Sequence, residues 1–178
     1  MRGVLARIGT DAQTAKDLNV AELELSPKSY GVSAGAHVYP WRGKSMALGL
    51  GGETLFAQSS FQSHDATTNK PTGDVFNRRL KSVSAQVSMN FGHKAGWSYL
   101  TVGYGPLAFE SYKATTTPDG LHDGTLNYGG GARWFNWDHL AFTFDIRFYA
   151  TNPADATTYT AGRSRNRLFV MSGGIALK

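Results

Sequence analysis

Apolar and polar residues alternate with a period of two along much of this chain. Residues 138–150 show the pattern most clearly, with apolar side chains at every second position: Leu140, Phe142, Phe144, Ile146 and Phe148. Successive side chains of a β-strand point to opposite faces, so this pattern predicts a strand with one apolar and one polar face. The same alternation occurs in residues 30–39, 45–57 and 79–92. We therefore expect an all-β fold.

Weaker alternation predicts four more strands, at residues 2–9, 97–109, 125–135 and 166–177, which brings the total to eight. Residues 11–25 have some apolar positions at helical spacing, and we interpret this segment as a loop. A length of 178 residues suits one substantial domain, so residues 1–178 are expected to form a single domain.

The connections between these strands alternate strictly in length. Residues 40–44, 92–96 and 136–138 form short connections, whereas residues 10–28, 58–78, 110–124 and 151–165 form long polar ones. This layout is typical of outer-membrane barrels, which have short periplasmic turns and long extracellular loops. The sequence thus predicts an eight-stranded antiparallel up-and-down transmembrane β-barrel with both termini on the periplasmic side.

Aromatic residues gather near the ends of the predicted strands. Trp41, Trp97, Trp134 and Trp137 all lie at or beside the short connections. Aromatic rings with one polar edge favour the membrane interface, so we expect these residues to form a periplasmic girdle. A looser girdle is expected at the long-loop ends, from Tyr30, Phe56, Phe109, Tyr128, Phe148 and Tyr149.

Two segments carry a resemblance to a known family. They are Tyr128-Gly-Gly-Gly-Ala-Arg-Trp-Phe-Asn-Trp-Asp-His-Leu-Ala-Phe-Thr-Phe-Asp-Ile-Arg-Phe148 and Arg167-Leu-Phe-Val-Met-Ser-Gly-Gly-Ile-Ala-Leu177. The chain resembles the small eight-stranded outer-membrane β-barrels of the OmpA and OmpX kind, in layout over nearly its whole length and in detail over these segments. The resemblance implies a bacterial outer-membrane location and insertion by the barrel assembly machinery. Members usually end on an aromatic residue, whereas this chain ends in Leu177-Lys178.

Polar residues on the predicted inner face form a candidate network. If the alternation holds, the residues that point into the lumen are Arg7, His37, Glu53, Gln86, Asn90, Arg133, Asp145 and Arg147. Charges removed from water must be paired or hydrated, because unpaired burial costs several kcal/mol per ion. We interpret the cluster as a polar plug that holds the barrel closed, and an ion path or catalytic pair is the alternative.

Composition narrows the possible functions. The chain has no cysteine, and its net charge of +5 comes from basic residues that are scattered until the C-terminal third, a poor fit to a nucleic-acid groove. It has no run of about 20 apolar residues that could form a transmembrane helix. Residues 1–10 lack the regions of a signal peptide, so we expect a mature or truncated form of a secreted protein.

We expect a non-enzymatic outer-membrane protein that acts in envelope structure or surface interaction through its loops, with no cofactor and no metal. Three alternatives stay open: a soluble lipocalin- or avidin-like barrel that binds an apolar ligand, a lipid A-modifying enzyme, and a narrow channel. Of the histidines, only His37 could pair with a serine on a neighbouring strand. Basic residues near the long-loop ends are candidate contacts for lipopolysaccharide phosphates: Lys28, Arg78, Arg79, Lys81, Arg163, Arg165 and Arg167.

Overall fold

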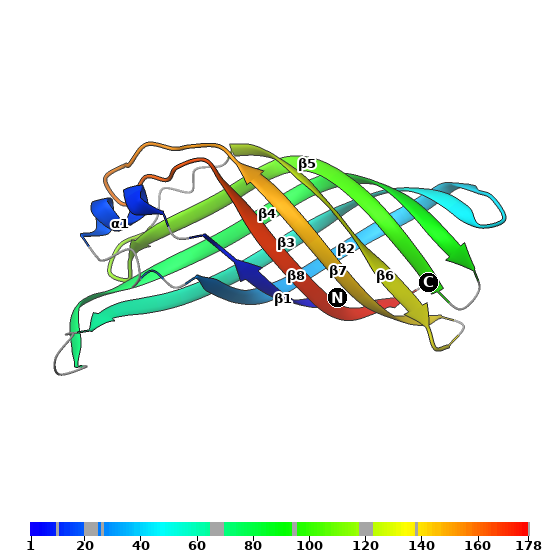
Figure 1. The fold of residues 1–178 in the computed structure, drawn as a ribbon, viewed down its shortest axis with the longest axis horizontal. Helices are drawn as coiled ribbons and strands as arrows, with labels where there is room; N and C mark the ends of the chain where they lie inside the picture. Colours follow the sequence, from blue (N-terminus) through cyan, green and yellow to red (C-terminus); the bar gives the residue numbers. More distant parts are fainter. Residues whose placement is uncertain are drawn as a thin grey trace.

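Eight antiparallel strands close into a ring in the computed structural model (Figure 1), which describes residues 1–9, 11–19, 25, 27–64, 70–93, 96–117, 123–137 and 139–177. The strands are β1 (Arg2–Arg7), β2 (Lys28–Arg42), β3 (Met46–His64), β4 (Pro71–His93), β5 (Gly96–Lys113), β6 (Asp123–Phe135), β7 (Leu140–Thr151) and β8 (Asn166–Leu177). Each strand pairs with the next one along the chain, and β1 pairs with β8. The predicted all-β fold of eight antiparallel up-and-down strands is confirmed.

The period-two alternation separates the two faces of the sheet. Along β4, side chains at even positions are buried on the inner face, and they are Ser82, Ser84, Gln86, Ser88 and Asn90. Their neighbours Val83, Val87 and Met89 lie exposed on the outer face. On β7, Thr143, Asp145 and Arg147 are buried, whereas Phe142 and Phe144 are exposed. The inner face is therefore polar along these strands and the outer face apolar.

The ring has a short-connection end and a long-connection end. Strands β2 and β3, β4 and β5, and β6 and β7 are joined by a few residues at the short-connection end. At the opposite end, residues 8–27 join β1 to β2, and residues 152–165 join β7 to β8. Figure 1 shows these two longer connections, with helix α1, at the same end of the molecule.

The expected loop at residues 58–78 is mostly strand, which corrects the prediction. Strand β3 continues to His64 and β4 begins at Pro71, and the two stay paired from Gln58–Arg79 to Gln62–Val75. The Phe61 and Phe76 rings stack with centroids 5.4 Å apart. This hairpin extends beyond the neighbouring strands (Figure 1), and β5 also continues further than expected, to Lys113. The segment is polar because it has little core to contact, and polarity alone predicted a loop.

A short helix, α1 (Ala12–Leu18), occupies part of the segment interpreted as a loop. Its N-cap Asp11 accepts a hydrogen bond from the Gln13 backbone N–H, and its C-cap Asn19 has the left-handed φ of 54°. A helix of this length is not stable by itself, so tertiary contacts must hold it. Among the described residues, no helix has the length and apolar character needed to cross a membrane.

An apolar layer fills the ring on the side of the long-connection end. Its members are buried residues from β1, β3, β4, β5, β7 and β8 together with Ile8: Val4, Ala6, Ile8, Leu55, Ala57, Leu80, Leu107, Phe109, Tyr149, Leu168 and Val170. Between this apolar layer and the short-connection end, the inner face carries the charged side chains Glu53, Asp145 and Arg147.

Candidate functional site

Four charged side chains meet inside the ring. Arg2 on β1 and Arg147 on β7 both contact Glu53 on β3 and Asp145 on β7. Arg147 Nε lies 2.8 Å from Asp145 Oδ1, and Arg147 Nη1 lies 3.0 Å from Glu53 Oε1. Arg2 also forms an ion pair with Glu53. Because two positive and two negative groups share the site, their charges balance.

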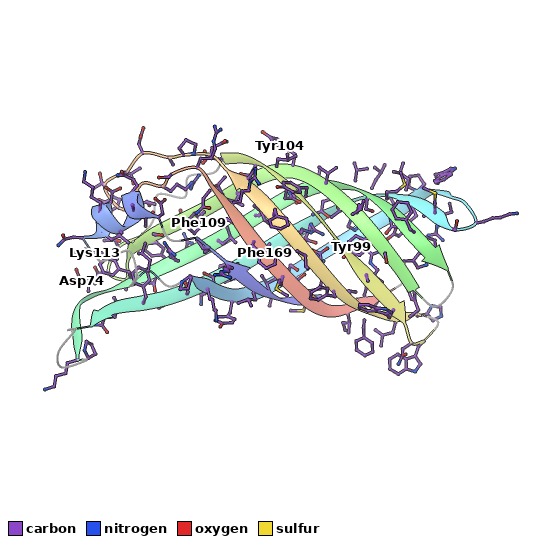
Figure 2. All side chains as sticks on the ribbon, viewed as in Figure 1. Asp74, Tyr99, Tyr104, Phe109, Lys113 and Phe169 are labelled. Atoms are coloured by element: carbon purple, nitrogen blue, oxygen red, sulfur yellow. The ribbon has the colours of Figure 1, made fainter. Side chains whose placement is uncertain are left out.

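Tyr99 extends this network on the β5 side. Its hydroxyl donates a hydrogen bond to Asp145 Oδ2 at 2.7 Å. The neighbouring strand makes room for the ring, because a Cβ at Gly131 would lie only 2.7 Å from Tyr99 Oη. Glycine at this position therefore allows β6 to approach the Tyr99 ring closely. Figure 2 labels Tyr99 among the side chains within the ring.

Most of the predicted lumen residues lie on the inner face. Glu53, Gln86, Asn90, Asp145 and Arg147 are buried there, and His37 and Arg133 line a cavity inside the ring. His37 lies opposite Gly51 on β3, so no serine faces it across that strand pair.

Arg7 is a correction, because it is exposed on the outer face while Arg2 occupies the network. On β1 the inner positions are Arg2, Val4 and Ala6, of which two are apolar. Placing the polar residues of β1 inside therefore selected the wrong face. The pairing of Arg2 with Gly174 and Ser33 fixes the face, and it is a tertiary property.

The cavity around His37 and Arg133 has a volume of about 460 Å³. Its lining comes from the short-connection half of the ring: Met1, Arg2, Gly35, Ala36, His37, Tyr39, Glu53, Tyr99, Arg133, Thr143, Arg147, Ile175, Ala176 and Leu177. A smaller cavity of about 130 Å³ adjoins it and shares Tyr39 and Arg133. The remaining residues of the smaller cavity are Arg42, Ala47, Asn90, Trp97 and Phe135.

Polar contacts join distant segments of the chain at the long-connection end. Asp11 accepts hydrogen bonds from the backbone N–H and the hydroxyl of Ser164, at 2.8 and 3.1 Å. Thr14 of α1 donates to Gly162 O at 2.8 Å. Arg163 pairs with Asp123 and donates to Phe109 O at 2.8 Å. These contacts join α1 to residues 152–165, and we call the assembly the cap.

The outer face is covered with exposed apolar side chains. Those on the ring itself include Val32, Val38, Leu50, Phe56, Val83, Val87, Met89, Phe91, Leu100, Val102, Tyr104, Leu126, Tyr128, Phe142, Phe144 and Ile175. They come from seven of the eight strands, so the apolar surface follows the ring rather than forming one patch. In Figure 2, side chains such as Tyr104 project away from the sheet.

Three of the four tryptophans lie exposed at the short-connection end: Trp41 (53%), Trp134 (53%) and Trp137 (58%). Trp97 does not join them, because it lines the smaller cavity beside Arg133. In the looser girdle, Tyr30, Phe56 and Tyr128 are exposed. Phe109 and Tyr149 are instead buried in the apolar layer. Sequence position predicted the level of these rings along the strands, but not their face.

The basic residues near the long-connection end divide into two groups. Lys28, Lys81, Arg165 and Arg167 are exposed, and Arg79 is half-buried with its guanidinium 2.8 Å from Glu110. Arg78 is instead only 1% exposed, inside the ring, with Phe61 and Phe109 around its guanidinium. Arg163 is held in the cap. Arg78 and Arg163 are therefore corrections to the predicted set of lipopolysaccharide contacts, because neither presents its charge to the outside.

Neither a protein-family model nor a curated protein matches the chain in sequence.

Proposed function

We propose that this chain is an integral β-barrel of a bacterial outer membrane that acts without catalysis, in envelope structure or surface interaction. The observation that carries the proposal is the polarity of its two faces. Leu100 is 64% exposed and Val83 60% exposed on the outer face, whereas Asp145 and Arg147 are each 2% exposed inside. Soluble proteins rarely expose a continuous apolar surface, and a barrel in lipid requires one.

The same polarity disfavours a soluble barrel that holds an apolar ligand. Such a barrel places its apolar surface around an internal cavity and its polar surface outside. Here the larger internal cavity is lined by Arg2, Glu53, Arg133 and Arg147. The apolar layer, in contrast, is packed, with Leu80, Leu107 and Leu168 each 0% exposed.

The proposed orientation has the short connections in the periplasm and the cap outside the cell. Exposed Trp41, Trp134 and Trp137 then lie at the periplasmic interface, where amphipathic rings are favoured. Lys81, Arg165 and Arg167 lie at the outer interface, where lipopolysaccharide carries phosphate groups that arginine binds through charge-assisted hydrogen bonds. Insertion by the barrel assembly machinery follows from the same proposal.

We propose that the barrel is closed and that its loops carry the function. The ion network and the apolar layer occupy the interior in series, and the cap covers the long-connection end. The projecting β3–β4 hairpin and the cap are the surfaces available to an extracellular or envelope partner.

Detergent dependence and gel mobility test the proposal directly. We expect the folded protein to require detergent or lipid for solubility, and to migrate faster on a gel when unheated than after boiling. A folded, monomeric protein in detergent-free buffer would refute the membrane assignment. Recovery of the protein in the outer-membrane fraction of an expressing bacterium would support the proposed location. Recovery in a soluble fraction would contradict it.

A further inference from the structure

Two arginines at the short-connection end have no acidic partner within the part of the chain that the structure describes. Among the described residues, no carboxylate lies within ion-pair distance of Arg133 or Arg42, although both line the adjoining cavities. Arg133 donates a hydrogen bond to the Tyr39 hydroxyl, and its guanidinium lies 4.6 Å from the centroid of the Tyr99 ring. Arg42 lies 5.3 Å from the centroid of the Tyr39 ring. Because the neighbouring ion network is already balanced, these two charges make the cavities electropositive.

A buried hydroxyl without a partner lies beside Arg133. Thr143 on β7 is directly opposite Arg133 on β6, so both side chains are on the inner face. Thr143 is 7% exposed and lines the larger cavity, and its Oγ1 has no hydrogen-bond partner among the residues that the structure describes. A buried polar atom is normally satisfied, and leaving a donor unsatisfied costs free energy. Rotation of the Thr143 side chain about its Cα–Cβ bond would present this buried hydroxyl to an acceptor in the cavity, and the same acceptor would neutralise Arg133.

We propose that this vestibule, formed by Tyr39, Arg42, Trp97, Arg133 and Thr143, binds the oxyanion group of a small water-soluble molecule. The guanidinium of Arg133 offers a planar fork that suits carboxylate or phosphate oxygens, and Thr143 adds a hydroxyl donor. The volume of about 460 Å³ lies in the range of small-molecule sites. The aromatic rings of Tyr39 and Trp97 give the rest of the ligand an apolar wall.

The vestibule belongs to the short-connection end. Its residues lie near the last residues of β2 and β6 and near the first residues of β5 and β7, all of which are at that end. The apolar layer lies between it and the cap, so a ligand enters from the short-connection end and does not pass through the ring. The site depends only on the inner face, and it would exist whether or not the outer face meets lipid.

An NMR titration of the folded, ¹⁵N-labelled protein in non-ionic detergent tests the site, with sodium phosphate and sodium acetate as separate probes. Sodium chloride at the same ionic strength serves as the control. We expect saturable shifts of the Arg133 side-chain Nε–H and the Thr143 amide with at least one of the two oxyanions. The probe that binds more tightly distinguishes a phosphate-bearing ligand from a carboxylate. Absence of a saturable shift with both probes would overturn the proposal.

Variants separate a built site from general attraction to a basic protein. R133Q is expected to weaken oxyanion binding by at least about tenfold, because it removes charge-assisted hydrogen bonds, and T143V by about fivefold. The matched control is R7Q, which removes the same charge from the outer face and should leave the affinity unchanged. If R133Q does not fold, the affinities of R133K and T143V test the site instead. R133K keeps the positive charge but loses the planar fork of guanidinium donors. Equal affinity losses in R7Q and in the vestibule variants would refute the site.

Discussion

The polarity of the outer face yields a prediction that separates a membrane barrel from a soluble one. Val87 and Val75 lie on the same strand, β4, and are 44% and 40% exposed. Val87 is the central residue of the outward-facing positions from Val83 to Phe91, whereas Val75 belongs to the hairpin that projects past the ring. Replacing each valine by arginine therefore makes the same chemical change at similar exposure.

The geometry of β4 sets the expected magnitude. The stretch from Val83 to Phe91 spans about 30 Å at about 3.4 Å per residue, which a strand tilted by about 40° converts to about 23 Å of height. That height is close to the apolar band of about 25 Å in outer-membrane barrels and puts Val87 near its middle. Val87→Arg should then cost about 2–4 kcal/mol, and Val75→Arg about 0–1 kcal/mol.

The assay is a urea titration of folding into lipid vesicles, followed by gel mobility and tryptophan fluorescence. In a soluble barrel both valines face water, and both changes should stay within about 0.5 kcal/mol of the unmodified protein. The reasoning is refuted if the two variants lose the same free energy of folding. A loss confined to Val75→Arg would contradict the placement of the apolar band on β4.

Four further predictions concern the interior, the cap, conduction and the outer rim. Asp145→Ala should lower the free energy of unfolding by about 3–5 kcal/mol, because it leaves buried guanidinium charge uncompensated. Asp74→Ala breaks the ion pair with Lys113, whose two side chains are 53% and 50% exposed (Figure 2), and should lower it by about 0–1 kcal/mol. Equal losses of both variants in a urea titration would contradict the network. Asp11→Ala should raise hydrogen exchange in α1 and residues 152–165 but not in the sheet, and unchanged exchange in the cap would contradict its role. Planar-bilayer recordings should show no stable conductance, so a stable ion-selective open state would refute the closed interior. Changing Arg165 and Arg167 together to Gln should weaken lipopolysaccharide binding and reduce its salt dependence. If the folded double variant keeps the wild-type affinity, the two arginines are solvated charges that do not contact lipopolysaccharide.

Period-two polarity determined the faces of the strands wherever the two sides differ strongly. On β7, apolar residues alternate with Thr143, Asp145 and Arg147, and only one arrangement keeps the apolar side chains together. The same holds for Val83 to Phe91 on β4. The alternation of short and long connections also follows from the sequence, because turn-forming and polar stretches interrupt the apolar period at regular places. These two features together predicted eight strands in up-and-down order.

The face was not predictable where the inner surface is itself apolar. Val4 and Ala6 lie on the inner face of β1 because they belong to the apolar layer. The rule that polar residues point inward therefore predicted Arg7 as the inner arginine of β1, whereas the structure has Arg2 there. Trp97 and Phe109 are aromatic residues near strand ends, as expected of an outer girdle, but they lie on the inner face. A shift of one residue exchanges the two faces of a strand, and only pairing with both neighbouring strands fixes that register.

Contacts between distant segments were also decided by tertiary structure alone. Asp11 and Ser164 are far apart in sequence, yet their hydrogen bonds hold α1 in the cap. Arg163 was predicted to lie at the surface because it is in a long connection, but its guanidinium pairs with Asp123 and donates a hydrogen bond to the Phe109 carbonyl. Arg133 and Thr143 became neighbours through the β6–β7 register. The sequence determined which side chains alternate, and closure of the ring decided which of them meet, because β1 must pair with both β2 and β8.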